Sequence, residues 1–180
     1  MMASVKPVQG VVIHITQNFK GIKVSLPRLR KLAKTICSRF SGNDIQNAGP
    51  GKTKYEINIA IVEDAEFRDL NKRFLNRKST SDCLSFDLSD DQEPDSSKLL
   101  EIVVNGELAV KQASLFGHSD EAELALYVTH GLLHHLGFDD STAKKSRKMH
   151  NIEDEILQKL GYGLVYNKGI KTQERRKVKK

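Results

Sequence analysis

AELALYVTHGLLHHLGFDD, residues 122–140, is the element of this 180-residue sequence on which the interpretation of the fold depends. Its apolar residues occupy nearly the whole circumference of a helix, which is typical of a helix buried on all sides. Ser119 or Asp120 would begin the helix, and Asp120 with Glu123 resembles a capping box. Gly137 would end it, at a place where a left-handed residue is favoured. The pattern therefore predicts a central, buried helix.

Two histidines in this helix have the spacing of metal ligands. His130 and His134 are four residues apart, which places their Cβ atoms about 5–6 Å apart on one face. Two imidazole nitrogens that bind one zinc ion at about 2.0–2.1 Å need such a separation. His135 lies about 100° around the helix from His134 and therefore faces elsewhere. Asp140 follows Gly137 by three residues, and a reversal of the chain there would bring its carboxylate back as a third ligand.

These three side chains predict a catalytic metal site. Three protein ligands leave a fourth position for water, as in catalytic and not in structural zinc sites. The alternative is a pair of histidines hydrogen-bonded within the core, because this spacing also arises by chance. The bend at Gly137 and the burial of the helix favour the metal, since buried imidazoles need partners. We therefore expect one Zn²⁺ per chain, or another divalent transition metal. His118 and His150 are interpreted as surface or helix-end residues.

The spacing HxxxHxxGxxD, residues 130–140, also matches a class of zinc proteases, with Asp as the third ligand. Those enzymes carry a Glu directly after the first His, where it acts as the general base. This chain has Gly131 at that position. The substitution disfavours peptide hydrolysis and favours metal-assisted attack on another electrophile.

The remaining segments alternate between strand and helix patterns. Strands are predicted at Val11–Thr16, Tyr55–Ile61, Asp82–Leu88 and Leu99–Val110, the last as one strand or as two broken near Asn105-Gly106. Helices are predicted to begin near Ser25, Glu63, Lys111 and Ala143. Residues 41–53 (SGNDIQNAGPGKT) and 89–98 (SDDQEPDSSK) have the composition of loops.

Composition limits the cellular setting. The chain begins without an apolar signal core, and no run approaches the ~20 apolar residues of a membrane span. Cys37 and Cys83 are far apart and form no CxxC, which argues against a disulfide framework and fits a reducing compartment. We expect a soluble cytoplasmic protein that does not contact a membrane, with an organelle as the alternative location. The sequence predicts no particular oligomeric state.

The formal net charge of +6 is uneven, because residues 167–180 (NKGIKTQERRKVKK) are rich in Lys and Arg and poor in apolar side chains. Such a segment buries too little surface to offset its ordering entropy. We therefore expect a single domain over residues 1–165 and a disordered basic tail over 166–180. The tail is either an electrostatic arm for nucleic acid or a solubilising extension.

HGLLHHLGFDD, residues 130–140, with Met149 and Glu153 in the next helix, resembles the YbeY endoribonucleases, bacterial factors for ribosomal RNA maturation whose motif reads HGxLHLxGYDH. Leu70-Asn71, SDCLSF at 81–86 and NGEL at 105–108 are similar to further family segments, and the resemblance covers roughly Tyr55 to Gly161. It implies an α+β fold, in which a mixed sheet of about four strands packs with helices. A central buried helix would carry the histidines, with one zinc in a cleft.

The resemblance also implies a function. It is that of a single-strand-specific, zinc-dependent endoribonuclease acting in 16S rRNA 3′-end maturation and ribosome quality control. The partners would be single-stranded RNA, 16S rRNA and the small ribosomal subunit. In such a reaction the metal would polarise a phosphate oxygen or deliver hydroxide, and a nearby Arg would offset the charge that builds on phosphate.

Two positions depart from the family pattern. Asp140 stands where the family usually has His; a carboxylate oxygen is an acceptable zinc ligand, although it is harder and should make a bound water less acidic. Leu75 stands where the family has an Arg thought to serve catalysis, so Arg73 or Arg77 would have to reach the phosphate. Further candidates are Asp82 and Ser85, which would bind the substrate or serve the structure.

Leu75 and Asp140 favour a second hypothesis, a catalytically weak ribosome-assembly or RNA-binding factor whose metal only holds the fold. A third is another metal-dependent hydrolase, such as a peptidase or an amidase, and Gly131 disfavours the peptidase.

Overall fold

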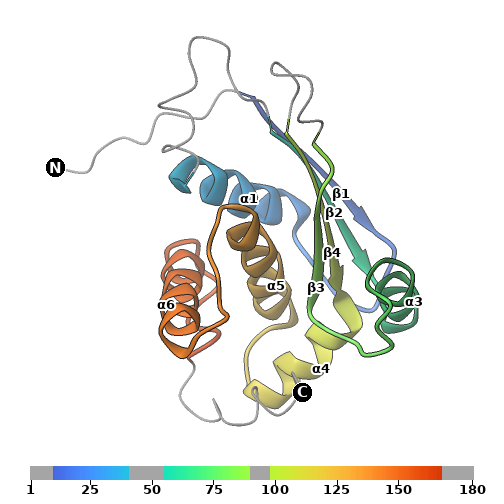
Figure 1. Ribbon diagram of the computed structural model, residues 1–180. Helices are drawn as coiled ribbons and strands as arrows, with labels where there is room; N and C mark the ends of the chain where they lie inside the picture. Colours follow the sequence, from blue (N-terminus) through green and yellow to red (C-terminus); the bar gives the residue numbers. More distant parts are fainter. Residues whose placement is uncertain (1–9, 41–54, 90–97, 168–180) are drawn as a thin grey trace, which may run out of the picture.

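A four-stranded mixed sheet forms one side of the molecule (Figure 1). The computed structural model describes residues 10–40, 55–89 and 98–167. The strands run in the order β1-β2-β4-β3, with β1, β2 and β4 parallel and β3 antiparallel to β4. Their bounds are β1 Val11–Gln17, β2 Tyr55–Val62, β3 Cys83–Asp87 and β4 Lys98–Asn105. β3 is therefore an edge strand.

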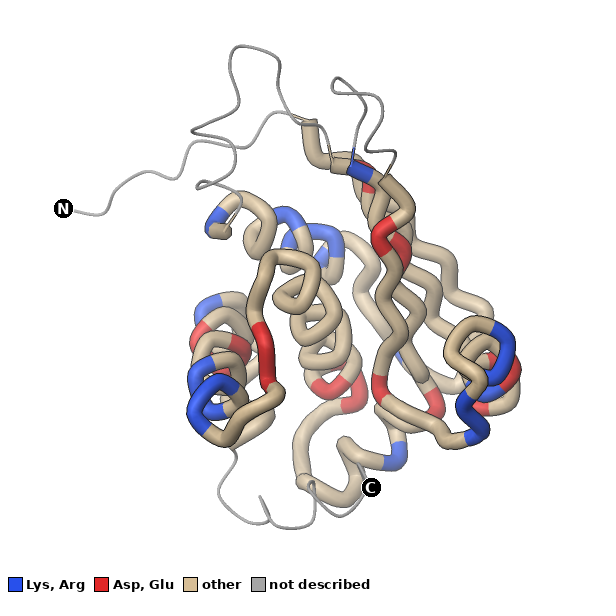
Figure 2. The backbone as a smooth tube through the Cα atoms, viewed as in Figure 1, with Lys and Arg blue, Asp and Glu red and all other residues tan. Residues whose placement is uncertain are grey.

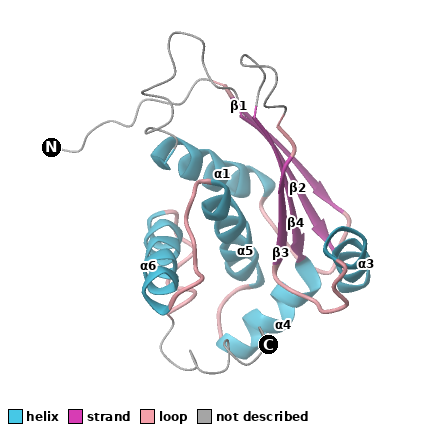
Figure 3. Ribbon diagram, in the orientation of Figure 1, coloured by secondary structure: helices cyan, strands magenta, loops and turns pink. Residues whose placement is uncertain are grey.

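Helices cover both faces of the sheet (Figure 3). They are α1 Leu26–Phe40, α3 Asp64–Leu75, α4 Gly106–Phe116, α5 Asp120–His135 and α6 Ala143–Lys159. α1 and α5 pack on one face, α6 lies outside α5, and α3 lies on the opposite face (Figure 1). The predicted α+β class, with a mixed sheet and a central helix that carries the histidines, is confirmed. Among the described residues, no helix has the length and apolar character to cross a membrane.

α5 is the centre of the core. Leu132 and Leu133 are fully buried, and every residue from Ala122 to Leu133 is buried. Gly131 faces the sheet, where an added Cβ would lie 3.3 Å from Ile102 Cγ2 and 3.5 Å from Cys83 Sγ. Glycine therefore lets the turn of α5 that carries His130 and His134 approach the sheet closely, which is a structural reason for the absence of a larger side chain at this position.

The predicted extension of the fourth strand to Val110 is wrong. The strand ends at Asn105, and α4 begins at Gly106, five residues before the helix start expected at Lys111. Asn105 is the N-cap of this helix, because its side-chain oxygen accepts a hydrogen bond from the Leu108 N–H at 2.9 Å. A short apolar run such as residues 108–110 fits a strand or a helix equally well, and the cap decides between them.

Several predicted segments lie outside the residues described: the loop at 41–53, residues 90–97 of the second loop, and 168–180 of the basic tail. Tyr166 and Asn167, at the predicted start of the tail, are described and contact α6. The backbone N–H groups of both donate to the Asp154 carboxylate, at 2.8 and 2.9 Å.

Asn105 also joins three parts of the fold through its fully buried side chain. Its Nδ2 donates to Asp64 Oδ1 at 2.8 Å and to Thr80 Oγ1 at 2.9 Å, while its backbone N–H donates to Asp82 O at 3.0 Å. Desolvation acts to raise the pKa of Asp64, but hydrogen bonds from Thr80 and Asn105 and the charge of Arg68 together lower it. Asn105 therefore fixes the loop before β3 against the ionised Asp64.

We expect Asn105→Asp to lower the free energy of unfolding at pH 7 by about 2 kcal/mol, because it removes two buried donors and adds a second carboxylate beside Asp64. Urea denaturation followed by circular dichroism measures this loss. The control is Asn151→Asp, the same chemical change at an exposed position on α6, which should alter stability by less than about 0.5 kcal/mol. Equal losses in the two variants would contradict the assigned role of Asn105.

Candidate metal centre

The three predicted ligands converge at the end of α5. His130 and His134 lie one helical turn apart, and their Nε2 atoms are 3.0 Å from each other. Gly137 adopts the left-handed conformation, with φ of 85°, and the chain turns back after it. Asp140 then places Oδ2 at 3.9 Å from His130 Nε2 and Oδ1 at 3.8 Å from His134 Nε2. His130 is buried, while His134 and Asp140 are partly exposed.

The hydrogen bonds of the two rings determine which nitrogens carry protons. His134 Nδ1 lies 3.1 Å from the carbonyl oxygen of Phe138, which can only accept, so this nitrogen is the donor. His130 Nδ1 lies 2.8 Å from Glu153 Oε1, and it donates to that carboxylate. When both rings are neutral, these bonds leave the lone pair of each ring on Nε2, and the two lone pairs face each other across 3.0 Å; when one ring is protonated, the same two atoms share a hydrogen bond. A cation between the two lone pairs relieves their repulsion.

The donor set fits a divalent transition metal. Tetrahedral zinc with nitrogens at about 2.0–2.1 Å needs an N–N separation of roughly 3.3 Å, close to the distance observed between the imidazoles. The carboxylate oxygens of Asp140 lie slightly farther away, at 3.8 and 3.9 Å from the two nitrogens, and this side chain is partly exposed. Two imidazoles and one carboxylate suit zinc and its neighbours in the first transition row.

Glu153 supports this arrangement from α6, and it is the site residue whose role the sequence analysis missed. Its fully buried carboxylate accepts from His130 Nδ1 through Oε1, and from His150 Nδ1 through Oε2 at 2.6 Å. Burial acts to raise the pKa of Glu153, but the hydrogen bonds and charges of the two histidines lower it to about 2. A carboxylate that orients a metal-binding imidazole is a recurrent feature of zinc sites.

The interpretation of His150 and His118 as surface or helix-end residues is wrong about the surface position of both, while His118 does stand at a helix end, directly after Gly117, the C-cap of α4. His150 is only 5% exposed and stacks on Tyr166, with ring centroids 3.4 Å apart. The His118 side chain is likewise 5% exposed, and its Nε2 lies 2.5 Å from Glu123 Oε2. Both histidines are partnered by a buried glutamate, which explains how polar rings are accommodated there.

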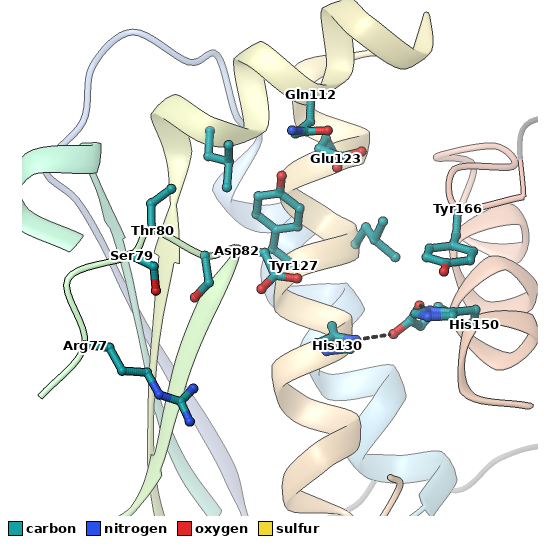
Figure 4. A pocket seen from close by; sticks show the side chains of 14 residues that line it. Arg77, Ser79, Thr80, Asp82, Gln112, Glu123, Tyr127, His130, His150 and Tyr166 are labelled. Carbon is teal, nitrogen blue, oxygen red and sulfur yellow. Dashed lines mark hydrogen bonds and ion pairs between the residues drawn. The ribbon is translucent and has the colours of Figure 1, made fainter. Parts of the chain in front are cut away.

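A cleft of about 240 Å³ opens beside His130 (Figure 4). Its walls come from the loop before β3, from the helices α4, α5 and α6, and from Tyr166, which follows α6. The side chains lining it include Arg77, Thr80, Asp82, Gln112, Glu123, Tyr127, His150 and Tyr166. Arg77 and Asp82 lie across the cleft from the histidines, and Gln112 and Glu123 lie at the end away from His130.

The structure separates the other predicted site residues into two groups. Arg77 and Asp82 line the cleft; Asp82 Oδ1 also accepts from the Cys83 N–H at 3.1 Å, so it serves the strand start as well. Of the residues described, those lining the cleft include neither Arg73, Ser85 nor Leu75. Arg73 instead pairs with Asp69 on α3, with Nη2 and Oδ2 2.7 Å apart.

Comparison with known proteins assigns most of the chain to one family. The sequence profile described as Endoribonuclease YbeY matches residues 14–161. Proteins described as Endoribonuclease YbeY are similar over most of their length: that of Clostridioides difficile is 34% identical, with 77% of this chain and 90% of the relative covered. That of Aquifex aeolicus is 32% identical, with 84% and 94% covered.

The solution structure of TM1509 from Thermotoga maritima has a similar fold. The TM-score is 0.50 at 22% sequence identity, and the match covers 82% of this chain and 91% of that one. At this identity the likeness concerns the fold alone.

We expect Glu153→Gln to weaken zinc binding about 10–100-fold, because the amide no longer accepts from both imidazoles and leaves His130 poorly oriented. Competition with a chromophoric chelator measures the affinity. The control is Glu155→Gln, on the same helix but partly exposed and paired with Arg39 and Lys159, which should bind zinc as the wild type does. An unchanged affinity in Glu153→Gln would show that this carboxylate does not orient the ligand.

Proposed function

The chain belongs to the YbeY endoribonuclease family, and from this membership we propose that it is a zinc-dependent endoribonuclease that cuts single-stranded RNA. One observation carries the proposal beyond the family assignment. Two imidazoles and a carboxylate converge on one point, one of these groups, His130, lines the cleft, and a cationic side chain lies on the opposite wall. His130, His134 and Asp140 are the proposed ligands.

The proposed ligands leave room for a substrate oxygen. A zinc ion held by three protein groups supplies Lewis acidity toward a phosphate oxygen and lowers the pKa of a water for attack on phosphorus. Glu153 keeps the proton of His130 on Nδ1, so that Nε2 stays a ligand. Phe138 does the same for His134 through its carbonyl oxygen.

Arg77 is the proposed partner of the scissile phosphate. It lines the cleft, and its charge is permanent, so it offsets the charge that develops on phosphorus oxygens in the transition state. Asp82 lies on the same wall and is an acceptor suited to a substrate donor, such as a ribose 2′-hydroxyl. In this proposal Arg77 replaces the arginine that the family has where this chain has Leu75.

The cleft suits a single strand. Its lining combines aromatic rings, Tyr127 and Tyr166, with polar groups that can meet the edge of an unstacked base. Bases are available in this way only in single-stranded RNA, because in a duplex they are stacked and paired. We propose that the substrate is 16S rRNA within the small ribosomal subunit and that cleavage matures its 3′ end and serves ribosome quality control in the cytoplasm. The net charge of +6 supports a polyanionic substrate.

A second candidate is a ribosome-assembly factor that binds RNA without cutting it. Leu75 favours this candidate, because the position that the family fills with an Arg is apolar here. This candidate differs from the endoribonuclease in one measurable respect: the metal-loaded wild type would bind single-stranded RNA but release no cleavage product.

We expect His134→Ala to lose stoichiometric zinc and at least about a hundredfold in RNA cleavage rate, because two ligands cannot hold the ion in a catalytic site. Metal content by mass spectrometry and cleavage of a 5′-labelled single-stranded RNA measure the two effects. His14→Ala removes an exposed histidine on β1 and should change neither. Cleavage that persists without metal would exclude the ion from the reaction.

We expect Arg77→Ala to lower kcat at saturating RNA by about 10–100-fold, since one donor to the transition state is lost. Arg73→Ala is the matched control, because Arg73 is engaged with Asp69 and does not line the cleft. Its kcat should stay within about twofold of the wild type. The reverse ranking of the two variants would assign the phosphate contact to Arg73.

A further inference from the structure

An aromatic ring stands exposed at the end of α3. Phe74 has 63% of its surface open to solvent, and the next residue, Leu75, has 44%. The Phe74 ring leans on Phe86 of β3, with centroids 5.1 Å apart and planes tilted by 54°. Isolated exposed apolar residues are common, but a supported ring beside a second exposed apolar side chain is a candidate for recognition.

The exposure follows from the position of α3 on the sheet. Phe67 and Leu70 lie on the same face of the helix as Phe74, seven and four residues before it, and both pack into the small core on this side. The last turn reaches β3, and β3 is the edge strand of the sheet. Phe74 therefore has Phe86 beneath it and solvent above it.

The segment around Phe74 is strongly basic. KRFLNRKS, residues 72–79, is exposed throughout and contains four cationic side chains and no acidic one. Figure 2 shows these charges gathered at the end of α3 and in the loop that follows. Lysine is depleted at protein–protein interfaces, whereas aromatic rings set among cations are typical of surfaces that bind single-stranded nucleic acid. The charge pattern favours RNA over a protein as the occupant.

This surface is continuous with the cleft. Arg77 belongs to the exposed segment and also lines the cleft, and it follows Phe74 by three residues, so their Cα atoms are at most about 11 Å apart. Phe86 and Cys83 lie on opposite faces of β3, since side chains alternate along a strand; Cys83 faces Gly131 of α5. A strand of RNA in the cleft can therefore pass over the β3 edge and reach the ring.

We propose that Phe74, supported by Phe86, is a stacking platform for one base of single-stranded RNA outside the cleft, with Lys72 and Lys78 meeting the phosphates beside it. The platform holds the strand by the face of a base, which all four bases share, so it adds affinity without adding sequence preference. The inference rests on the proposed function in one respect, namely that the strand in the cleft is RNA.

The test is steady-state cleavage by zinc-loaded protein of two RNAs, a trinucleotide that fills the cleft and a twelve-nucleotide strand that extends beyond it. Phe74→Leu keeps an apolar side chain on Phe86 but removes the aromatic face, and Phe74→Tyr keeps both. We expect Phe74→Leu to raise KM for the long RNA about tenfold and to leave its kcat and the trinucleotide kinetics unchanged. Phe74→Tyr should match the wild type. Leu115→Ala, an exposed apolar residue on α4, is the control.

A series of long RNAs, each with one abasic nucleotide, locates the stacked base. One position should raise KM about tenfold with the wild type and have no effect with Phe74→Leu. Equal KM values for the wild type and Phe74→Leu on the long RNA would overturn the proposal. If the KM values were equal but Phe74→Leu no longer bound ribosomal proteins, the exposed surface around Phe74 would be a protein-docking surface.

Failure of the platform and failure of the proposed function give different results. A wild type that cuts RNA, with Phe74→Leu indistinguishable from it, removes the platform and leaves the nuclease. A wild type that cuts neither RNA removes the nuclease. Fluorescence anisotropy of the labelled long RNA then tests the platform by itself. We expect Phe74→Leu to bind this RNA about tenfold more weakly than the wild type. An unchanged affinity would contradict the platform.

Discussion

Two imidazole nitrogens that point their lone pairs at each other are the constraint from which the rest of the site follows. His130 and His134 each give their Nδ1 proton to an oxygen acceptor, so their Nε2 atoms, 3.0 Å apart, have no proton to share while both rings are neutral. A cation at that point satisfies both nitrogens. The acceptor behind His134 is a backbone carbonyl, whereas the acceptor behind His130 is the buried carboxylate of Glu153, held between His130 and His150.

The fold supplies the rigidity that this arrangement needs. α5 is enclosed by α1, α4, α6 and the sheet, and Gly131 lets the turn that carries His130 and His134 lie close to Ile102 and Cys83. α6 is anchored in turn by Asp154, whose carboxylate accepts from the backbone N–H groups of residues 165–167, at 2.8–3.0 Å. These bonds place Tyr166 against His150, the second histidine that contacts Glu153. The chain after α6 therefore packs behind the Glu153 carboxylate. The ligands therefore depend on contacts across the whole domain.

The parts of this design that are local in sequence could be predicted, and those that depend on packing could not. Helical spacing identified His130 and His134 as a pair, and Gly137 indicated the reversal that returns Asp140. The role of Glu153 requires α6 to lie against α5, which no local pattern specifies. One signal was available: His150, Glu153 and Leu157 share a face of α6, so the charged residues lie on its apolar side. A break near Asn105-Gly106 is one of the two predicted alternatives and is where β4 ends, but the apolar run after it does not reveal that a helix follows.

The two departures from the family pattern, Asp140 and Leu75, both lower the positive charge available to a bound phosphate. With histidine as the third ligand, a divalent ion beside Glu153 would leave the centre with one net positive charge. With Asp140 as the proposed third ligand, the two carboxylates would cancel the charge of the ion, and the centre by itself would no longer attract an anion. The arginine expected at Leu75 is absent as well. Positive charge would then come from Arg77, on the cleft wall opposite His130, and from the exposed cations around Phe74 outside the cleft. In the proposed reaction the basic segment 72–79, at the end of α3 and just after it, would therefore supply the positive charge that the metal centre lacks.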